Sequence, residues 1–324
     1  DYDMLEIKEL TYIAMISFGI VAALGPIFIP MLTRFKFGQT VREDGPQTHL
    51  QKNGTPTMGG ILLILAIFIT SLTKGSLNSD MMIGLLSVVG FGLVGFIDDF
   101  IIIKKKRSLG LNPKQKIILQ FILALVISIY QYNSSIDASS FDIPFTDIAI
   151  NVGVFYIPIM TFIIVGIVNA VNLTDGLDGL ASGVTIIVAS FFLLFANLVA
   201  SNAEVAVIAA ATVGACLGFL CFNSYPAKIF MGDTGSMALG GAVVAFAVLT
   251  NSILLIPIVG GIYFAEAVSV IIQVLGFKLT KKRIFKMAPI HHHFEQCGLP
   301  ETRVVFLFWI ASVVLAWIGL IAIF

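Results

Sequence analysis

Charged residues are scarce in this sequence. Asp, Glu, Lys and Arg make up 12% of its 324 residues, whereas 58% are hydrophobic and the mean hydropathy is +0.99. A soluble domain carries about 25% charged residues. The composition therefore excludes an ordinary water-soluble domain and predicts a protein embedded in a bilayer.

Cysteines are also scarce, and the sequence shows no clear signal peptide. The three cysteines are Cys216, Cys221 and Cys297, and we interpret them as small buried hydrophobic residues and not as a disulfide framework. The first ten residues are acidic, which argues against a cleavable signal peptide. We interpret residues 1–3 as additions to a natural start at Met4.

Apolar stretches long enough to span a membrane recur along the chain. A spanning helix needs about 20 mostly apolar residues. We predict ten spans, at residues 10–33, 58–72, 81–97, 117–130, 152–168, 184–200, 205–222, 236–250, 253–277 and 304–324. The expected architecture is an all-α, polytopic membrane protein with a single domain over residues 1–324. Glu266 lies inside the ninth span, where a lone acid is costly, so we expect this span to be broken or only partly inserted.

The distribution of basic residues predicts the orientation. The segments after spans 1, 3, 7 and 9 hold 17 of the 19 Lys and Arg residues, and only Lys8 and Lys74 fall on the other side. Loops rich in Lys and Arg stay in the cytoplasm. We therefore expect both termini to be external. We also expect a positive cytoplasmic face and a negative external face, whose charges cancel in the net charge of zero.

The unusual polar residues gather at the predicted cytoplasmic ends of the spans. All four histidines and the densest Asp, Asn and Gly motifs lie there. A transporter usually places ionisable residues at mid-membrane depth, whereas these spans are almost free of charge. The layout predicts an enzyme with its active site at the cytoplasmic membrane surface.

Two acidic motifs follow the third and fifth spans. Asp98 and Asp99 close the third span, where adjacent carboxylates at the negative pole of a helix need a cation or a lysine beside them. In NAVNLTDGLDGLA, Asn172, Asp175 and Asp178 are spaced three apart and would share one face of a helix. This segment has no Lys or Arg, so a divalent cation or nucleotide hydroxyls are the expected partners. Solvated boundary charges and a structural turn are the alternatives.

A third acidic motif, FMGDTGSMALGG, opens the eighth span. Free N–H groups at a helix N-terminus bind phosphate, while the carboxylate of Asp233 suits Mg²⁺, which favours one or two carboxylates plus substrate phosphate oxygens. The alternative is that Asp233 or Thr234 only caps the helix. Phe230 and Asn223 nearby can stack on a base and form hydrogen bonds to it.

Two further motifs favour anionic ligands. The side chains of His291, His292 and His293 point in different directions, so they suit phosphate or carboxylate contacts better than a closed zinc site. A structural or pH-sensing role is the alternative. Residues 51–60, QKNGTPTMGG, form a flexible stretch that contains Lys52 and enters the second span. Five such motifs on one membrane face are hard to attribute to coincidence.

Nearly the whole chain resembles the polyprenyl-phosphate N-acetylhexosamine-1-phosphate transferase superfamily. Four strings carry the resemblance: KNGTPTMGG, NLTDGLDGLA, FMGDTGSMALGG and APIHHHFE. Within it they are most similar to the bacterial phospho-N-acetylmuramoyl-pentapeptide transferases. The resemblance implies ten helices, external termini and a cytoplasmic active site. It implies Mg²⁺-dependent transfer of the phosphosugar from UDP-N-acetylmuramoyl-pentapeptide to undecaprenyl phosphate. The products would be UMP and lipid I, from the first membrane step of peptidoglycan synthesis.

The resemblance also implies which residues form the site. The catalytic positions are Asp98, Asp99, Asp175, Asp233 and His292, with Asp233 as the Mg²⁺ ligand. Uridine recognition falls on Asp178, Asn223 and Phe230. The other substrate-binding positions are Lys52, Thr57, Lys114, Asn172, His291 and His293.

Two chemistries are compatible with these residues. In one, Asp98 accepts the last proton of undecaprenyl phosphate, which then attacks the donor directly. In the other, an aspartate such as Asp233 attacks first and forms an acyl phosphate. We favour direct attack, because a lipid phosphate is already anionic near neutral pH and the second route asks a metal-holding carboxylate to be the nucleophile.

Two rival functions differ in their substrates. A sister transferase would use UDP-N-acetylglucosamine, but the APIHHHFE string favours the muramoyl-pentapeptide donor. A membrane transporter is the rival from another class. The expected partners are the two substrates and the bilayer of a bacterial cytoplasmic membrane, with no nucleic acid, and the resemblance is compatible with a homodimer.

Overall fold

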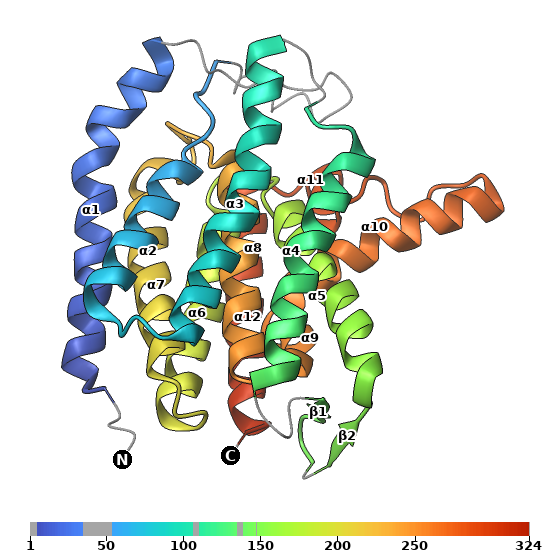
Figure 1. Ribbon diagram of the computed structural model, residues 1–324. Helices are drawn as coiled ribbons and strands as arrows, with labels where there is room; N and C mark the ends of the chain where they lie inside the picture. Colours follow the sequence, from blue (N-terminus) through green and yellow to red (C-terminus); the bar gives the residue numbers. More distant parts are fainter. Residues whose placement is uncertain (1–4, 35–53, 106–109, 135–138, 147, 324) are drawn as a thin grey trace.

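A computed structural model describes residues 5–34, 54–105, 110–134, 139–146 and 148–323. Within these ranges the chain is 78% helical with almost no strand, which confirms the predicted all-α membrane fold. Nine of the described helices are long and apolar enough to cross a membrane, and α2 is a shorter apolar helix. Figure 1 shows a bundle from which α10 projects to one side.

Ten principal helices correspond in order to the ten predicted spans. They are α1 (Ile7–Arg34), α2 (Gly60–Lys74), α3 (Ser79–Lys105), α4 (Pro113–Ser134), α5 (Tyr156–Thr174), α6 (Leu180–Leu198), α7 (Ala203–Asn223), α8 (Gly232–Leu249), α10 (Gly261–Thr280) and α12 (Glu301–Ile321). The shorter elements are α9 (Ile256–Val259), α11 (Ile290–Gln296), the 3₁₀ turns η2 (Gly153–Phe155) and η3 (Ile253–Leu255), and the strands β1 (Ser140–Asp142) and β2 (Ala149–Asn151). The two strands pair antiparallel.

Helix α3 is longer than predicted at its C-terminal end. It continues to Lys105, so Asp98 and Asp99 lie inside the helix. Their predicted place at its negative pole is wrong, because the apolar residues 100–103 continue the helix beyond the pair. The aspartates are therefore held by regular helical geometry.

The segment after α5 is a turn and not a helix. Asp175 is the C-cap of α5, and Gly179 has a φ of 78°, which a regular helix cannot contain. The expectation that Asn172, Asp175 and Asp178 share one helix face is therefore wrong. The turn instead presents its side chains in different directions.

The ninth predicted span is broken, as expected. It is divided into η3, α9 and α10, with Gly260 between α9 and α10 and Gly261 as the first residue of α10. Helix α10 then leaves the bundle sideways (Figure 1). Its buried residues lie near its start and are Ile262, Tyr263, Glu266 and Ser269.

Helix α8 forms the most buried part of the bundle. Its apolar window is 89% buried, compared with 22% for α1 and for α10. Helix α3 packs closely along it because glycines remove side chains from the contact. A Cβ at Gly95 would lie 2.1 Å from the carbonyl oxygen of Asp233, and a Cβ at Gly241 would lie 2.3 Å from that of Ser87. This contact fixes the aspartate pair of α3 beside the start of α8.

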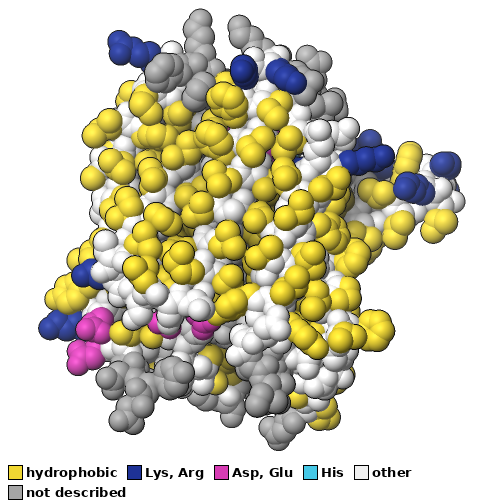
Figure 2. All heavy atoms as spheres, viewed as in Figure 1, with side chains coloured by type: hydrophobic (Ala, Val, Ile, Leu, Met, Phe, Trp, Pro, Cys, Tyr) yellow, Lys and Arg dark blue, Asp and Glu magenta, His cyan; other side chains and the backbone are white. Residues whose placement is uncertain are grey.

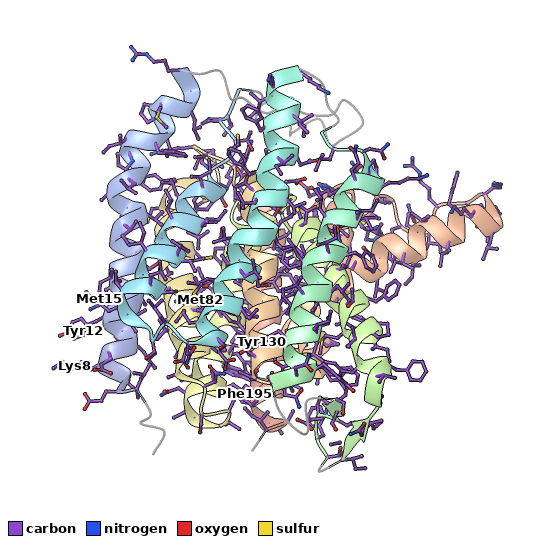
Figure 3. The ribbon with its side chains drawn as sticks, in the orientation of Figure 1. Lys8, Tyr12, Met15, Met82, Tyr130 and Phe195 are labelled. Carbon is purple, nitrogen blue, oxygen red and sulfur yellow. The ribbon has the colours of Figure 1, made fainter. Side chains whose placement is uncertain are left out.

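The two ends of the bundle differ in charge. Helix α1 begins and α12 ends at one end, which the β1–β2 hairpin shares (Figure 1). Lys and Arg side chains gather at the opposite end and at the tip of α10, and hydrophobic side chains cover the flank between them (Figure 2). At the end that holds the termini, Asp80 accepts hydrogen bonds from Tyr130 (2.7 Å; Figure 3) and Asn202 (2.9 Å).

All three cysteines are free. Cys216 is buried, as predicted, but Cys221 and Cys297 are exposed. The interpretation as buried hydrophobic residues is therefore wrong for these two, because one lies on an outer face of α7 and the other ends the short helix α11.

Candidate active site

A carboxylate from another helix holds the start of α8. Asp99 of α3 accepts hydrogen bonds from the backbone N–H groups of Asp233 (3.2 Å) and Thr234 (2.9 Å) and from the Thr234 hydroxyl (2.6 Å). Two of the N–H groups that could bind a phosphate are therefore already bonded to Asp99. Asp99, and not the side chain of Asp233 or Thr234, caps this helix start, and phosphate binding there stays a prediction.

The segment that leads into α2 lies beside this helix start. Backbone hydrogen bonds join residues 56–60 to residues 230–231. Thr57 is buried in this contact. A Cβ at Gly232 would lie 2.8 Å from the Thr57 hydroxyl and 2.5 Å from Asp99 Oδ2. Only glycine leaves room for both groups to approach the chain at this position.

Lys116 of α4 links two of the aspartates. Its ammonium contacts Asp233 Oδ2 directly and lies 3.9 Å from Asp98 Oδ2. Asp98 Oδ1 accepts a hydrogen bond from the backbone N–H of Leu111 (2.7 Å), and Asp233 Oδ1 accepts one from the amide of Asn172 (2.9 Å). Groups from α3, α4, α5 and α8 therefore meet at one point.

This acidic cluster carries more negative than positive formal charge. Among the described residues, the carboxylates of Asp98, Asp99 and Asp233 lie near one ammonium, that of Lys116. Mg²⁺ prefers oxygen donors and needs only one or two protein carboxylates when substrate phosphates complete its coordination. Asp233 already contacts a cation in the form of this ammonium and Asp98 lies near it, so the cluster fits the ion. Among the described residues, no three His, Cys, Asp or Glu side chains form a ready-made metal site.

The turn between α5 and α6 is held by its neighbours. The buried Asp178 accepts a hydrogen bond from the N–H of Ala227 (3.0 Å) and donates its own N–H to Glu301 (2.8 Å). The buried Asn223 accepts from the N–H of Gly179 (3.1 Å) and donates to a backbone carbonyl (2.9 Å). Two residues predicted to recognise uridine thus fix the backbone of the turn, and their contact with uridine stays a prediction.

The three histidines have different surroundings. His291 is buried beside Glu266. His292 Nδ1 lies 2.8 Å from a glutamate three residues later, and His293 Nδ1 accepts a hydrogen bond from the N–H of Lys286 (3.1 Å). His292 and His293 are half-buried, whereas His291 faces protein on all sides in this conformation.

The remaining predicted residues lie around the acidic cluster or outside the described ranges. Asp175 is half-buried at the end of α5, and Phe230 is half-buried before α8. Lys114 is exposed on the first turn of α4. Lys52 lies outside the described residues. The roles of these four residues stay predictions.

The lysine of the acidic cluster is one that sequence reasoning missed. The buried face of α4 contains Gln120, Ala124 and Ile127, and Lys116 lies four residues before Gln120, on the same face. Lys114 lies on another face. Helical periodicity therefore contained the signal that distinguishes the two lysines.

Comparisons with known proteins show the family to which this chain belongs. Residues 81–251 match the model of glycosyl transferase family 4, and residues 52–64 match signature 1 of phospho-N-acetylmuramoyl-pentapeptide-transferase. A phospho-N-acetylmuramoyl-pentapeptide-transferase of Clostridioides difficile is 72% identical over 321 residues, which cover 99% of this chain and 100% of the relative. Relatives with the same name from Alkaliphilus metalliredigens and Caldanaerobacter subterraneus are 53% and 49% identical. These alignments cover 98% and 97% of this chain and 99% and 98% of the relatives, respectively.

Proposed function

The chain belongs to the phospho-N-acetylmuramoyl-pentapeptide-transferase family, and we propose that the acidic cluster of Asp98, Asp99 and Asp233 is its Mg²⁺-dependent active site. The protein transfers phospho-N-acetylmuramoyl-pentapeptide from its UDP-linked donor to a lipid carrier, giving lipid I and UMP. Undecaprenyl phosphate is the proposed carrier. The basic end of the bundle supports a site on the cytoplasmic side of a bacterial cytoplasmic membrane.

The direct contact between Asp233 and the Lys116 ammonium carries this proposal. It marks a place, held by four helices, where carboxylate oxygens already bind a cation. A donor diphosphate brings further negative charge to the same place, and phosphoryl transfer depends chiefly on positioning and on neutralising such charge. Mg²⁺ held by Asp233 would supply this neutralisation when bound.

The transfer exchanges one phosphorus–oxygen bond for another. An oxygen of the lipid phosphate forms a bond to the phosphorus attached to the sugar, and the bond from that phosphorus to the UMP oxygen breaks. We assign Asp98 as the group that accepts the last proton of the lipid phosphate, because its Oδ2 lies 3.9 Å from Lys116 and is not in direct contact with it. Asp233 has both oxygens engaged, by Asn172 and Lys116, which argues against its acting as the nucleophile.

Other predicted residues have supporting roles in this proposal. Asn172 orients Asp233 through its amide. Phe230 is the proposed stacking partner for uracil, and Asp178 and Asn223 hold the backbone beside it. His292 is the histidine proposed to act in catalysis, and His293, which is half-buried like it, is proposed to contact the donor.

The test is UMP release by purified protein in detergent with undecaprenyl phosphate, Mg²⁺ and a choice of donor. We expect turnover with UDP-N-acetylmuramoyl-pentapeptide and loss of turnover in EDTA. Asp233→Asn should lower kcat by about 10²–10³-fold, because it removes charge from the cation-binding group. Asp80→Asn is the matched control, since Asp80 has hydrogen-bond partners at the opposite end of the bundle, and it should keep nearly full activity.

Three results would contradict the proposal. Turnover with UDP-N-acetylglucosamine alone would move the protein to the sister group of transferases. An Asp233→Asn variant as active as Asp80→Asn would place the chemistry elsewhere. Stoichiometric UMP release with donor alone, and phosphosugar trapped on the protein, would replace direct attack by a covalent intermediate.

A further inference from the structure

Two ionisable side chains that the proposed reaction does not use lie together inside the protein. Glu266 of α10 and His291, the second residue of α11, are both 0% exposed. Glu266 Oε1 lies 3.0 Å from His291 Nδ1, and the backbone N–H of His291 points to Glu266 Oε2 at 3.5 Å. A buried carboxylate is costly unless it is paired, so each side chain makes burial of the other tolerable.

The other edge of the His291 ring packs against the turn of the active site. A Cβ at Gly176 would lie 2.1 Å from His291 Nε2 and 2.6 Å from His291 Cε1. Gly176 directly follows Asp175, the C-cap of α5 and a predicted member of the acidic core. The ring therefore lies between the carboxylate of α10 and the backbone that carries Asp175.

The orientation of the ring depends on Glu266. A carboxylate beside Nδ1 places the ring proton on that nitrogen and leaves Nε2 toward the turn. The contact is short but not linear, since neither His291 nitrogen makes a hydrogen bond of good geometry with a described residue.

The far half of the same turn is held independently. Glu301 accepts the N–H of Asp178 at 2.8 Å, and Asn223 accepts the N–H of Gly179 at 3.1 Å. These bonds fix the turn where it enters α6. The contact with His291 acts at the Gly176 end, where the turn leaves α5.

We propose that Glu266 is a positioning residue that holds His291 against Gly176 and thereby fixes Asp175 in the active site. This inference rests on the proposed function, because only that function gives Asp175 a catalytic role. It explains why an acid lies in the broken ninth span. It also makes the first turns of α10 part of the scaffold of the site, although α10 contributes no residue to the acidic cluster.

The experiment compares Glu266→Met and Glu266→Gln with a control on the same helix. Gln has nearly the same shape as Glu and keeps a side-chain oxygen beside His291 Nδ1, so it preserves the contact and the packing, whereas Met has no oxygen there. Tyr263→Phe is the control, because the Tyr263 hydroxyl forms a buried hydrogen bond to Thr185 (2.7 Å) and not to the His291 ring. The readouts are kcat and KM for the donor, thermal stability, and hydrogen exchange of a peptide covering residues 173–180.

We expect Glu266→Met to lower kcat by about 10–100-fold with little change in KM, as is found when a buried partner of a site residue is removed. Hydrogen exchange should rise in residues 173–180 more than elsewhere. Glu266→Gln should stay within about threefold of the parent protein, and Tyr263→Phe should match the parent in kcat and in exchange of the turn.

A Glu266→Met variant with the kcat and turn exchange of Tyr263→Phe would overturn the inference. So would an increase in exchange spread evenly over the protein, which indicates general destabilisation. The exchange measurement does not depend on turnover. If the parent protein lacked activity with the muramoyl donor, the proposed function would fail, while local protection of the turn by Glu266 would still be tested.

Discussion

Lys116 is the residue on which the charge balance of the acidic cluster depends. It is the cationic side chain that contacts Asp233 directly and lies near Asp98. A partly buried ammonium beside carboxylates is worth more than an exposed pair, because water screens it less. Without it, no other described side chain is shown to compensate the charges of Asp98 and Asp233.

Replacing this lysine should therefore cost more activity than replacing its neighbour. We expect Lys116→Met to lower kcat by about 10²-fold or more, and Lys114→Met to lower it by less than tenfold, because Lys114 is exposed. UMP release under saturating donor measures both. A larger loss of kcat for Lys114→Met than for Lys116→Met would support the substrate-binding role predicted for Lys114 from the family resemblance. Lys116 would then be a structural partner of the aspartates only.

Most of the acidic cluster, but not its contacts, could be predicted from the sequence. Asp98, Asp99, Asp233 and Asn172 lie where the motifs suggested, at one end of the bundle. The hydrogen bonds from the start of α8 to Asp99 could not be predicted, because they join residues 134 and 135 positions apart. The burial of His291 could not be predicted either, since a run of three histidines does not indicate which one faces inward.

At the scale of the elements, the close contact between α3 and α8 determines the geometry of the site. The glycines in α3 and α8 let the two backbones approach until no side chain fits between them. This brings a carboxylate of α3 to the N-terminus of α8. The same contact restricts movement of α3 along the axis of α8, so Asp98 and Asp99 stay beside Asp233.

Gly95→Ala should disturb both stability and activity. Its Cβ would lie 2.1 Å from the carbonyl oxygen of Asp233, which belongs to the backbone and cannot rotate away. We expect a loss of about 1–3 kcal/mol in stability from overpacking, measured by thermal unfolding in detergent. Turnover should fall at least tenfold because Asp98 and Asp99 move away from Asp233.

Gly166→Ala of α5 is the matched control. A Cβ at Gly166 meets no atom within 4 Å, and alanine is the better helix former by about 1 kcal/mol. The control should be as stable as the parent or more stable, with unchanged activity. Equal behaviour of the two variants would show that α3 and α8 tolerate a wider separation than the structure indicates.

Hydropathy predicted the existence of the helices better than their ends. Ten spans were expected, and ten principal helices are found in that order. The ends of α3 and α5 were misplaced, because both helices continue past polar residues at which the predicted spans stopped. Helix α3 runs on through the apolar residues 100–103 to Lys105, and α5 runs on to Thr174. The break in the ninth span was foreseen from the lone acid, Glu266, but the sequence did not show its histidine partner.

The whole molecule has a basic end that holds the site and an opposite end that holds the termini (Figures 1 and 2). The orientation in the membrane is a prediction from this charge asymmetry. The exposed Cys297, at the end of α11, is a natural reporter for it. The homodimer expected from the resemblance also stays a prediction.

A membrane-impermeant maleimide should label Cys297 in inverted vesicles and not in sealed right-side-out vesicles. The background is Cys221→Ala, which removes the other exposed cysteine. A second protein, with Cys297→Ser and Ala149→Cys added, carries its thiol on an exposed position of β2 at the opposite end and should show the reverse pattern. Labelling of Cys297 in right-side-out vesicles would contradict the predicted orientation.

The sideways course of α10 makes the bundle wider toward the end that carries the basic residues than toward the end that carries the termini (Figure 1). If the bundle stands upright in a membrane, its two halves have different cross-sections in the two leaflets. Each copy therefore displaces more lipid from one leaflet than from the other, and a membrane crowded with aligned copies bends so that the wider side is convex. Small liposomes have more area in their outer leaflet, so insertion with the wide half outward relieves this stress. In small liposomes reconstituted with the protein, we therefore expect most molecules to have the end with the acidic cluster facing the outer solution.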